Sequence, residues 1–265
     1  MRIWMILEEL AAAARQRIRE QKEKIPSSAM RRMAEEMGAD TGFPFYQAIR
    51  KPGLSFICEV KKASPSKGVI AEDFPYLKIA EEYEEAGAAA LSVLTEPTRF
   101  LGQDKYLEEI AQKVKLPILR KDFTIDEYMI DQARVMGASA VLLICSLLSA
   151  GQLKEYLEKA RSLGLSALVE AHTENEVEMG LLAGAQIIGV NNRNLKDFTV
   201  DIENSVRLRP MVPPSVCFIS ESGIRTGADL KRLYENGTDG VLIGEAFMRA
   251  ADKKALLNEF REGKR

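Results

Sequence analysis

An acid and a base placed two residues apart, Glu59 and Lys61, follow an apolar run near the start of the chain. Side chains alternate along an extended strand, so both would face the same side as Ile57. Charged groups that face a core are costly unless they are paired or functional. The two residues are therefore either a structural ion pair at a strand end or part of an active site that opens where the strand finishes.

Polar side chains end four later apolar runs in the same way. They are Arg120, Lys121 and Asp122; Glu170; Asn191, Asn192, Arg193 and Asn194; and Glu221, Ser222 and Gly223. Alternation places Lys121, Glu170 and Glu221 each above an apolar residue two positions earlier, in columns that could fill the interior of a barrel. A strand-end carboxylate is often only a cap or a salt bridge, but the same pattern on five strands favours one shared site.

The runs that carry these residues alternate with helical segments. Eight runs are expected to be strands: residues 56–60, 88–94, 117–120, 140–145, 166–170, 187–191, 216–220 and 241–244. Apolar spacings of three and four predict helices at 77–86, 106–114, 126–136, 152–162 and 228–236, and glycines 87, 137, 164, 184 and 237 close helices before five of the strands. Apolar strands joined by crossover helices predict an α/β fold, a TIM (β/α)8 barrel, with catalytic groups at the strands' carboxyl ends. A doubly wound open sheet is the alternative.

Residues 1–50 precede the repeat and are expected to be an N-terminal helical extension. Helices are predicted at 6–21, 28–36 and 44–49, with Ser27 or Ser28 as the N-cap of the second. They would cover the bottom of the barrel or its rim. No long linker rich in Pro, Gly or Ser interrupts the chain. We therefore expect one domain over residues 1–265, with the barrel at 54–265.

Composition argues against several classes of partner. The net charge of −2, with both signs interspersed over 265 residues, argues against nucleic acid. No apolar run approaches the roughly 20 residues of a membrane span, and residues 1–9 carry acids where a secretion signal would be basic. A cytoplasmic protein without membrane contact is expected. Cys58, Cys145 and Cys217 lie far apart in apolar runs and predict buried thiols rather than metal ligands or disulfides.

Glycine turns predict a phosphate site. Ser222 and Gly223 follow the seventh predicted strand, and Gly244 follows the eighth. Backbone amides at these two positions form the common phosphate site of the barrel. Ser64 and Lys61 could add a hydroxyl and a positive charge. The expected partner is a phosphorylated small molecule.

These motifs together resemble the indole-3-glycerol phosphate synthase family. The resemblance is carried by residues 59–66, 94–96 with Phe100 and Gly102, 119–123, 169–171, 189–195 and 220–224. It implies a tryptophan-pathway lyase that converts 1-(2-carboxyphenylamino)-1-deoxyribulose 5-phosphate into indole-3-glycerol phosphate, carbon dioxide and water. It also implies no cofactor and no metal. A monomer is favoured.

That reaction suits the residues. Lys121 is our candidate for the acid that protonates the ketone oxygen during ring closure, with a pKa lowered by a partly dry pocket. Glu170, across the mouth, suits the proton transfers of dehydration. Lys61 could hold the substrate carboxylate, contact phosphate or act as an acid.

Further residues would bind or orient the substrate. Arg193 can face the carboxylate before it leaves, while Glu59, Asn191 and Glu221 orient the lysines and the sugar hydroxyls. An apolar slot for the aromatic ring would come from Phe100, Phe123 and Leu142, with Phe198 as a further candidate.

Two residues receive no role. A serine often follows the last strand's glycine in the family, but Glu245 stands here, and a carboxylate would repel phosphate unless it points away. His172, the only histidine, is expected to face the helical layer or solvent. Two other functions stay open: a sugar-phosphate aldolase with a Schiff-base lysine, and a non-catalytic barrel that binds a phosphorylated metabolite.

Overall fold

The computed structural model describes residues 4–194 and 198–263. Its main element is a closed barrel of parallel strands: β1 (Ser55–Val60), β4 (Ala90–Leu94), β5 (Ile118–Lys121), β6 (Ala140–Ile144), β7 (Ser166–Ala171), β8 (Ile187–Asn191), β9 (Cys217–Glu221) and β10 (Gly240–Ile243). Strand β1 pairs with β4 on one side and with β10 on the other. This closure confirms the predicted TIM barrel and rules out the open sheet.

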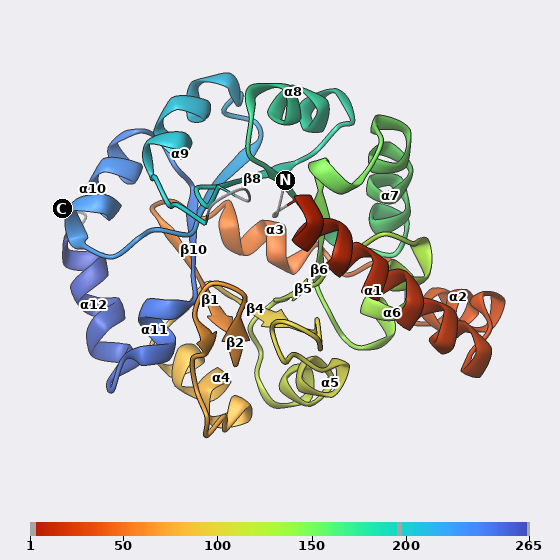
Figure 1. The fold of residues 1–265 in the computed structure, drawn as a ribbon. Coiled ribbons are helices and arrows are strands. Elements are labelled where there is room, and N and C mark those ends of the chain that lie inside the picture. Colours follow the sequence, from red (N-terminus) through yellow and green to blue (C-terminus); the bar gives the residue numbers. More distant parts are fainter. Residues whose placement is uncertain (1–3, 195–197, 264–265) are drawn as a thin grey trace.

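Helices surround the barrel (Figure 1). They are α4 (Tyr76–Glu85), α5 (Asp104–Lys113), α6 (Glu127–Val135), α7 (Ala150–Ser162), α8 (Glu174–Leu182), α9 (Glu203–Leu208), α10 (Gly227–Glu235), α11 (Glu245–Arg249) and α12 (Lys253–Gly263), with the 3-10 turns η1 (Cys145–Leu147) and η2 (Arg209–Met211). A short hairpin, β2 (Ala63–Ser64) and β3 (Gly68–Val69), follows β1. The glycines predicted to close helices all have positive φ, as their left-handed turns require.

Each barrel strand buries both of its faces, as its apolar sequence predicts. In β1, Phe56, Cys58 and Val60 pack in the layer between barrel and helices. Ile57 points the other way, into the barrel interior, where it joins Leu119 and other fully buried side chains. The alternation on which the site prediction depends is therefore present, and the interior is a packed core below the strand ends.

Three helices precede the barrel: α1 (Trp4–Lys24), α2 (Ser27–Glu36) and α3 (Pro44–Ile49). Helix α2 packs beside α6, whereas α3 and α1 cover opposite ends of the barrel. Phe45 and Ile49 of α3 are fully buried against the interior cluster and close its bottom. Helix α1 instead crosses the other end, where Leu7 and Leu10 line the cavity described below. The two predicted alternatives, bottom and rim, thus both hold, for different helices.

Three smaller predictions can be checked. The predicted serine cap of α2 is wrong, because Pro26 occupies the N-cap position and no side chain caps the helix. Its fixed φ suits the start of a helix. The three cysteines are buried free thiols, as expected. None of the helices in the described ranges has the length and apolar character needed to traverse a lipid bilayer.

Candidate active site

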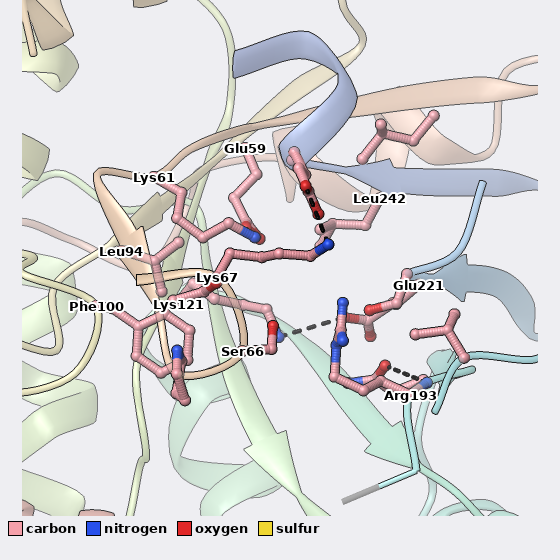
Figure 2. Close-up of a pocket in the computed structure, with 18 of the residues that line it drawn as sticks. Glu59, Lys61, Ser66, Lys67, Leu94, Phe100, Lys121, Arg193, Glu221 and Leu242 are labelled. Atoms are coloured by element: carbon pink, nitrogen blue, oxygen red, sulfur yellow. Dashed lines mark hydrogen bonds and ion pairs between the residues drawn. The ribbon is translucent and has the colours of Figure 1, made fainter. Parts of the chain in front are cut away.

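A cavity of about 500 Å³ opens at the carboxyl ends of the barrel strands (Figure 2). Every site residue predicted from the sequence lines it: Glu59, Lys61, Ser64, Phe100, Lys121, Phe123, Leu142, Glu170, Asn191, Arg193, Glu221, Ser222, Gly223 and Gly244. The structure therefore brings together residues from β1, β5, β6, β7, β8, β9 and β10 and their loops. Residue 195, at the end of one quoted motif, lies outside the described residues.

Lys121 lies between two carboxylates at the base of the cavity. Its Nζ lies 2.9 Å from Glu170 Oε2 and 3.3 Å from Glu221 Oε2. All three side chains are nearly buried, and the Lys121 amine points toward Glu221 in Figure 2. Such a charged cluster in a protein interior indicates a functional site, because packing alone gives no reason to bury it.

The expected lowering of the Lys121 pKa is wrong. Burial by itself lowers this pKa, but the carboxylates of Glu170, Glu221 and Glu59 outweigh burial and hold it above its ordinary value. The side chain is therefore a charged ammonium at neutral pH and holds a proton to donate.

The two carboxylates that share Lys121 differ from each other. Burial raises the pKa of Glu221 to about 7, and the nearby Glu170 charge adds to this rise against the opposing effect of Lys121. Burial also acts to raise the pKa of Glu170, but Lys121 and His172 outweigh it and hold the pKa below its ordinary value. Glu170 is thus an anion that can accept a proton, whereas Glu221 changes its charge near neutrality.

A glycine missed in the sequence makes room for Glu221. Gly189 lies on β8 beside β9, and a Cβ at this position would collide with the Glu221 carboxylate. The residue stands within the quoted 189–195 motif, so its identity was available, but only the tertiary structure shows what it faces.

Lys61 and Glu59, from β1 and the loop after it, form a second ion pair in the cavity, with Lys61 Nζ 2.6 Å from Glu59 Oε2. Gly244 at the end of β10 lies against this pair. A Cβ at Gly244 would come within 2.7 Å of Glu59 Oε2 and 2.8 Å of Lys61 Nζ. The glycine therefore lets the backbone approach the pair, as an anion-binding turn requires.

The predicted phosphate turns have unusual backbone conformations. Ser222 and Gly223 have φ of 67° and 83°, and a Cβ at Gly223 would collide with Val200. Gly244 is the N-cap of α11. These turns and Ser64 line the cavity. The geometry can accommodate an oxyanion on backbone amides.

Glu245, which replaces the expected serine, is paired with cations. Its Oε1 lies 3.6 Å from Lys67 Nζ and 3.3 Å from Arg249 Nε. Figure 2 shows Lys67 reaching across the cavity mouth. Lys67 was missed, although it directly follows the quoted 59–66 motif.

The apolar part of the cavity contains two aromatic rings. The centroids of Phe100 and Phe123 lie 6.2 Å apart, with the rings tilted by 45°. Leu142 and Phe198 line the same cavity, which gives one wall an apolar surface that suits a flat aromatic group.

Asn191 and Arg193 connect β8 to the charged cluster. The Asn191 Oδ1 accepts a hydrogen bond from the Arg193 backbone N–H at 3.0 Å, and the Asn191 side chain also bonds to the Glu170 carboxylate. Arg193 Nη1 donates to the Phe198 carbonyl oxygen at 3.3 Å. Arg193 is thereby held at the cavity wall with its positive charge available to an anion.

Helix α1 is attached to the loop that follows Lys121. Arg17 donates two hydrogen bonds to the Asp122 carboxylate, at 2.8 and 2.7 Å, and Asp122 also accepts one from its neighbour Phe123. Both bonds come from Arg17 Nη2, and the two residues lie more than a hundred positions apart in the sequence, so no local pattern could have identified Arg17. It joins the N-terminal helix to Lys121 and Phe123.

The expectation that His172 faces the helical layer or solvent holds only in part, because the ring lies against Glu176 of α8 but also approaches the charged cluster. Residues 170 and 172 lie two positions apart at the end of β7, so their side chains face the same way. His172 Nε2 lies 3.8 Å from Glu170 Oε1, and the side chain is only 14% exposed. The spacing alone could have signalled this position.

Within residues 4–194 and 198–263, no group of three or more His, Cys, Asp and Glu side chains has an arrangement that could hold a metal ion.

Comparison with solved structures gives fold relatives. The chain superposes on 3-hexulose-6-phosphate synthase from Salmonella typhimurium with a TM-score of 0.65 and 13% identity, covering 80% of this chain and 98% of that one. It superposes on thiamine phosphate pyrophosphorylase from Pyrococcus furiosus with a TM-score of 0.59 and 16% identity, covering 80% and 95%. At such identities the likeness concerns the barrel fold alone.

Comparison of sequences is more specific. The chain is 52% identical to indole-3-glycerol phosphate synthase of Ruminiclostridium cellulolyticum over 257 residues, 97% of this chain and 99% of that relative. It is 51% identical to the enzyme of the same name from Endomicrobium trichonymphae over 258 residues, 97% and 100% of the two chains. The family model described as indole-3-glycerol phosphate synthase matches residues 7–260. The chain therefore belongs to the indole-3-glycerol phosphate synthase family.

Proposed function

We propose that the protein is an indole-3-glycerol phosphate synthase. It would close the ring of 1-(2-carboxyphenylamino)-1-deoxyribulose 5-phosphate, release carbon dioxide and water, and form indole-3-glycerol phosphate. The observation that carries this proposal is the buried cluster of Lys121, Glu170 and Glu221 beside the Phe100 and Phe123 rings. Such a cluster supplies acid and base groups next to an apolar surface for the aromatic ring.

Ring closure needs an acid at the ketone oxygen. The Lys121 ammonium donates its proton there as the aromatic carbon attacks the carbonyl carbon. Glu170, 2.9 Å from Lys121 Nζ, accepts a proton during the following dehydration and can return it to Lys121. A direct hydrogen bond between acid and base lets the site reset after each turnover.

The other groups bind and orient. The phosphate binds to the amides at Ser222, Gly223 and Gly244, near the Lys61 charge. Arg193 holds the substrate carboxylate until it leaves. Asn191 fixes both Arg193 and Glu170 by its hydrogen bonds, and Glu59 fixes Lys61. Leu142 and Ser64 complete the apolar and phosphate ends of the cavity.

Turnover of the substrate tests the proposal. The purified protein is mixed with the carboxyphenylamino deoxyribulose phosphate, and indole fluorescence is followed with time. We expect a signal whose rate is proportional to enzyme concentration. If no fluorescence develops at any enzyme concentration, the proposed activity is wrong.

The fluorescence assay, together with borohydride trapping, separates the lyase from the two other functions. An aldolase would form an imine between a lysine and its substrate, so borohydride would trap a covalent adduct at Lys61 or Lys121. A non-catalytic barrel would bind the phosphorylated substrate without product formation. For the lyase we expect product and no adduct.

We further propose that the protein works as a cytoplasmic monomer of one domain, without nucleic acid or membrane partners. The low net charge of −2 supports the absence of a nucleic-acid partner. The packing of α3 inside the barrel bottom supports one folding unit. Gel filtration with light scattering should give the mass of one chain, and thermal unfolding should show one cooperative transition.

A further inference from the structure

His172 has no part in the steps above, yet its imidazole lies beside the charged cluster. Its Nε2 lies 3.8 Å from Glu170 Oε1, while Lys121 bonds to the other oxygen of the same carboxylate. On the far side of the ring, Nδ1 lies 3.5 Å from Glu176 Oε2 on α8. The ring therefore lies between two carboxylates, one of them the base proposed for catalysis.

Solvent exposure of the side chains increases from Glu170 through His172 to Glu176. The side chains of Glu170, His172 and Glu176 are 5%, 14% and 21% exposed, so the three lead from the buried cluster toward solvent. Neither imidazole nitrogen has a hydrogen-bond partner among the residues that the structure describes. A ring rotation that shortens the 3.8 Å contact of Nε2 or the 3.5 Å contact of Nδ1 to roughly 3 Å would form such a bond.

Backbone contacts hold the ring between its neighbours. The His172 N–H donates to Glu176 Oε2 at 2.6 Å, which fixes that carboxylate at the start of α8. The Asn204 amide of α9 donates to the His172 carbonyl oxygen at 3.2 Å. Backbone at position 172 would keep both bonds with a different side chain, so the imidazole can be replaced without removing them.

The proposed reaction needs a proton from solvent in every turnover. The ketone oxygen leaves as water after gaining two protons, and only one proton is returned, from the methylene carbon that enters the new ring. The carboxylate leaves as neutral carbon dioxide and takes no proton with it. One substrate carboxylate anion and one proton therefore give the indole product, carbon dioxide and water, and the buried cluster must be resupplied.

We propose that His172 relays this proton from Glu176 to Glu170. The inference rests on the proposed function. A solvent proton binds to Glu176 and passes to Nδ1, while the proton on Nε2 passes to Glu170 Oε1. The ring, now protonated on Nδ1, regains its first tautomer when the side chain rotates so that Nε2 takes a proton from Glu176 and Nδ1 returns one to the same carboxylate, with no net change in charge. Glu170 passes the relayed proton to Lys121. His172 thus acts through Glu170 and does not touch the substrate.

The charges around the ring support this role. Carboxylates face it from three elements: Glu170 of β7, Glu176 of α8 and Glu221 of β9. Burial lowers the pKa of His172, but these carboxylates outweigh burial and hold the pKa above its ordinary value. The ring therefore holds a proton more tightly than an unperturbed imidazole does.

Variants at position 172 test the relay in the full-length protein. We expect His172→Asn and His172→Ala to lower kcat roughly 10- to 100-fold, less than the loss of a direct acid or base. The loss should grow as the pH rises, and the solvent deuterium isotope effect on kcat should increase. Added imidazole should restore the kcat of His172→Ala in proportion to the concentration of imidazolium.

Two substitutions on α8 form a matched pair. Glu176→Gln keeps an oxygen that accepts from the His172 backbone but cannot take up a proton, so we expect kcat to fall about threefold to tenfold. The control is Glu174→Gln. Glu174 lies in the same first turn of α8 but pairs with Arg207 and not with His172. The control variant should leave kcat and its pH profile unchanged.

The outcomes separate the relay from the function on which it rests. An inactive wild-type protein contradicts the proposed function, and an active Glu170→Gln variant contradicts the role of Glu170. If the wild-type protein is active and Glu170→Gln is not, but the His172 variants keep the wild-type rate and pH profile, the relay is wrong. A reduced rate without imidazole rescue and without a changed isotope effect would also overturn it, since a purely structural role predicts that result.

Discussion

The cavity contains two buried lysines in different surroundings. Lys61 and Lys121 are almost equally exposed, at 16% and 14% of their side chains. Among the residues that the structure describes, Lys61 pairs with one carboxylate, Glu59. Lys121 lies against two, Glu170 and Glu221, whose pKa values are shifted in opposite directions. Burial alone therefore does not distinguish the lysines, but the number of partners does.

The difference indicates a division of work. A lysine that shares its proton with two unlike carboxylates can give a proton and regain it within one cluster. A lysine in a single ion pair beside the Gly244 turn mainly supplies positive charge. We therefore expect Lys121 to act in the chemical step and Lys61 in binding.

Removal of Lys121 is expected to have the largest effect. Lys121→Ala should lower kcat by roughly 10²- to 10⁴-fold, the range for loss of a positioned acid. Circular dichroism and Tm check that the fold survives. Lys154→Ala, at an exposed position of α7, serves as the control. Near-native turnover of Lys121→Ala would transfer the acid role to Lys61 and reverse the comparison.

The raised pKa of Glu221 predicts a pH dependence of stability. This pKa is about 7 in the folded chain and 4.5 as the ordinary value, so the folded state binds the proton more tightly. The stabilisation is complete below about pH 4.5 and is lost as the pH rises through about 7. The loss corresponds to roughly 3 kcal/mol.

Urea unfolding at several pH values tests this shift. Glu221→Gln cannot ionise, so the pH dependence of its free energy of unfolding should be flatter than that of the wild type. Glu158→Gln, at an exposed position of α7, should follow the wild type. Identical curves for wild type and Glu221→Gln would show that Glu221 has an ordinary pKa.

Removal of Lys61 is expected to weaken binding more than chemistry. Lys61→Ala should raise KM about tenfold and lower kcat far less than Lys121→Ala does. Steady-state kinetics on the two variants measure this split directly. Equal losses of kcat in both would mean that Lys61 also takes part in proton transfer.

Substitution of the glycine beside each lysine's carboxylate partner is expected to have the smallest effect on activity. Gly189→Ala and Gly244→Ala crowd Glu221 and the Lys61 pair respectively, and each should cost about 1–3 kcal/mol of stability. Of the two, Gly189→Ala should mainly lower kcat, and Gly244→Ala should mainly raise KM. Gly151→Ala on α7 is the control, because a Cβ there meets no atom within 4 Å. The same kinetic change in both glycine variants would remove the distinction between the clusters.

Much of the site followed from local patterns in the sequence. Period-two alternation correctly paired Glu59 with Lys61 and set Lys121, Glu170 and Glu221 above apolar residues of the barrel interior. These predictions succeeded because a strand fixes the direction of each side chain from its neighbours alone. His172 obeyed the same rule, since its spacing of two from Glu170 brings the ring near that carboxylate as well as against α8.

The barrel, the strand ends that carry polar groups and the glycines that turn the backbone there could all be predicted from the order of residues. The raised pKa of Lys121, the space that Gly189 leaves for Glu221 and the hydrogen bonds from Arg17 to Asp122 could not. The groups involved in these three features lie far apart along the chain. A pKa or a steric fit depends on groups that closure of the barrel brings within a few ångströms, and their separation in sequence carries no record of that contact.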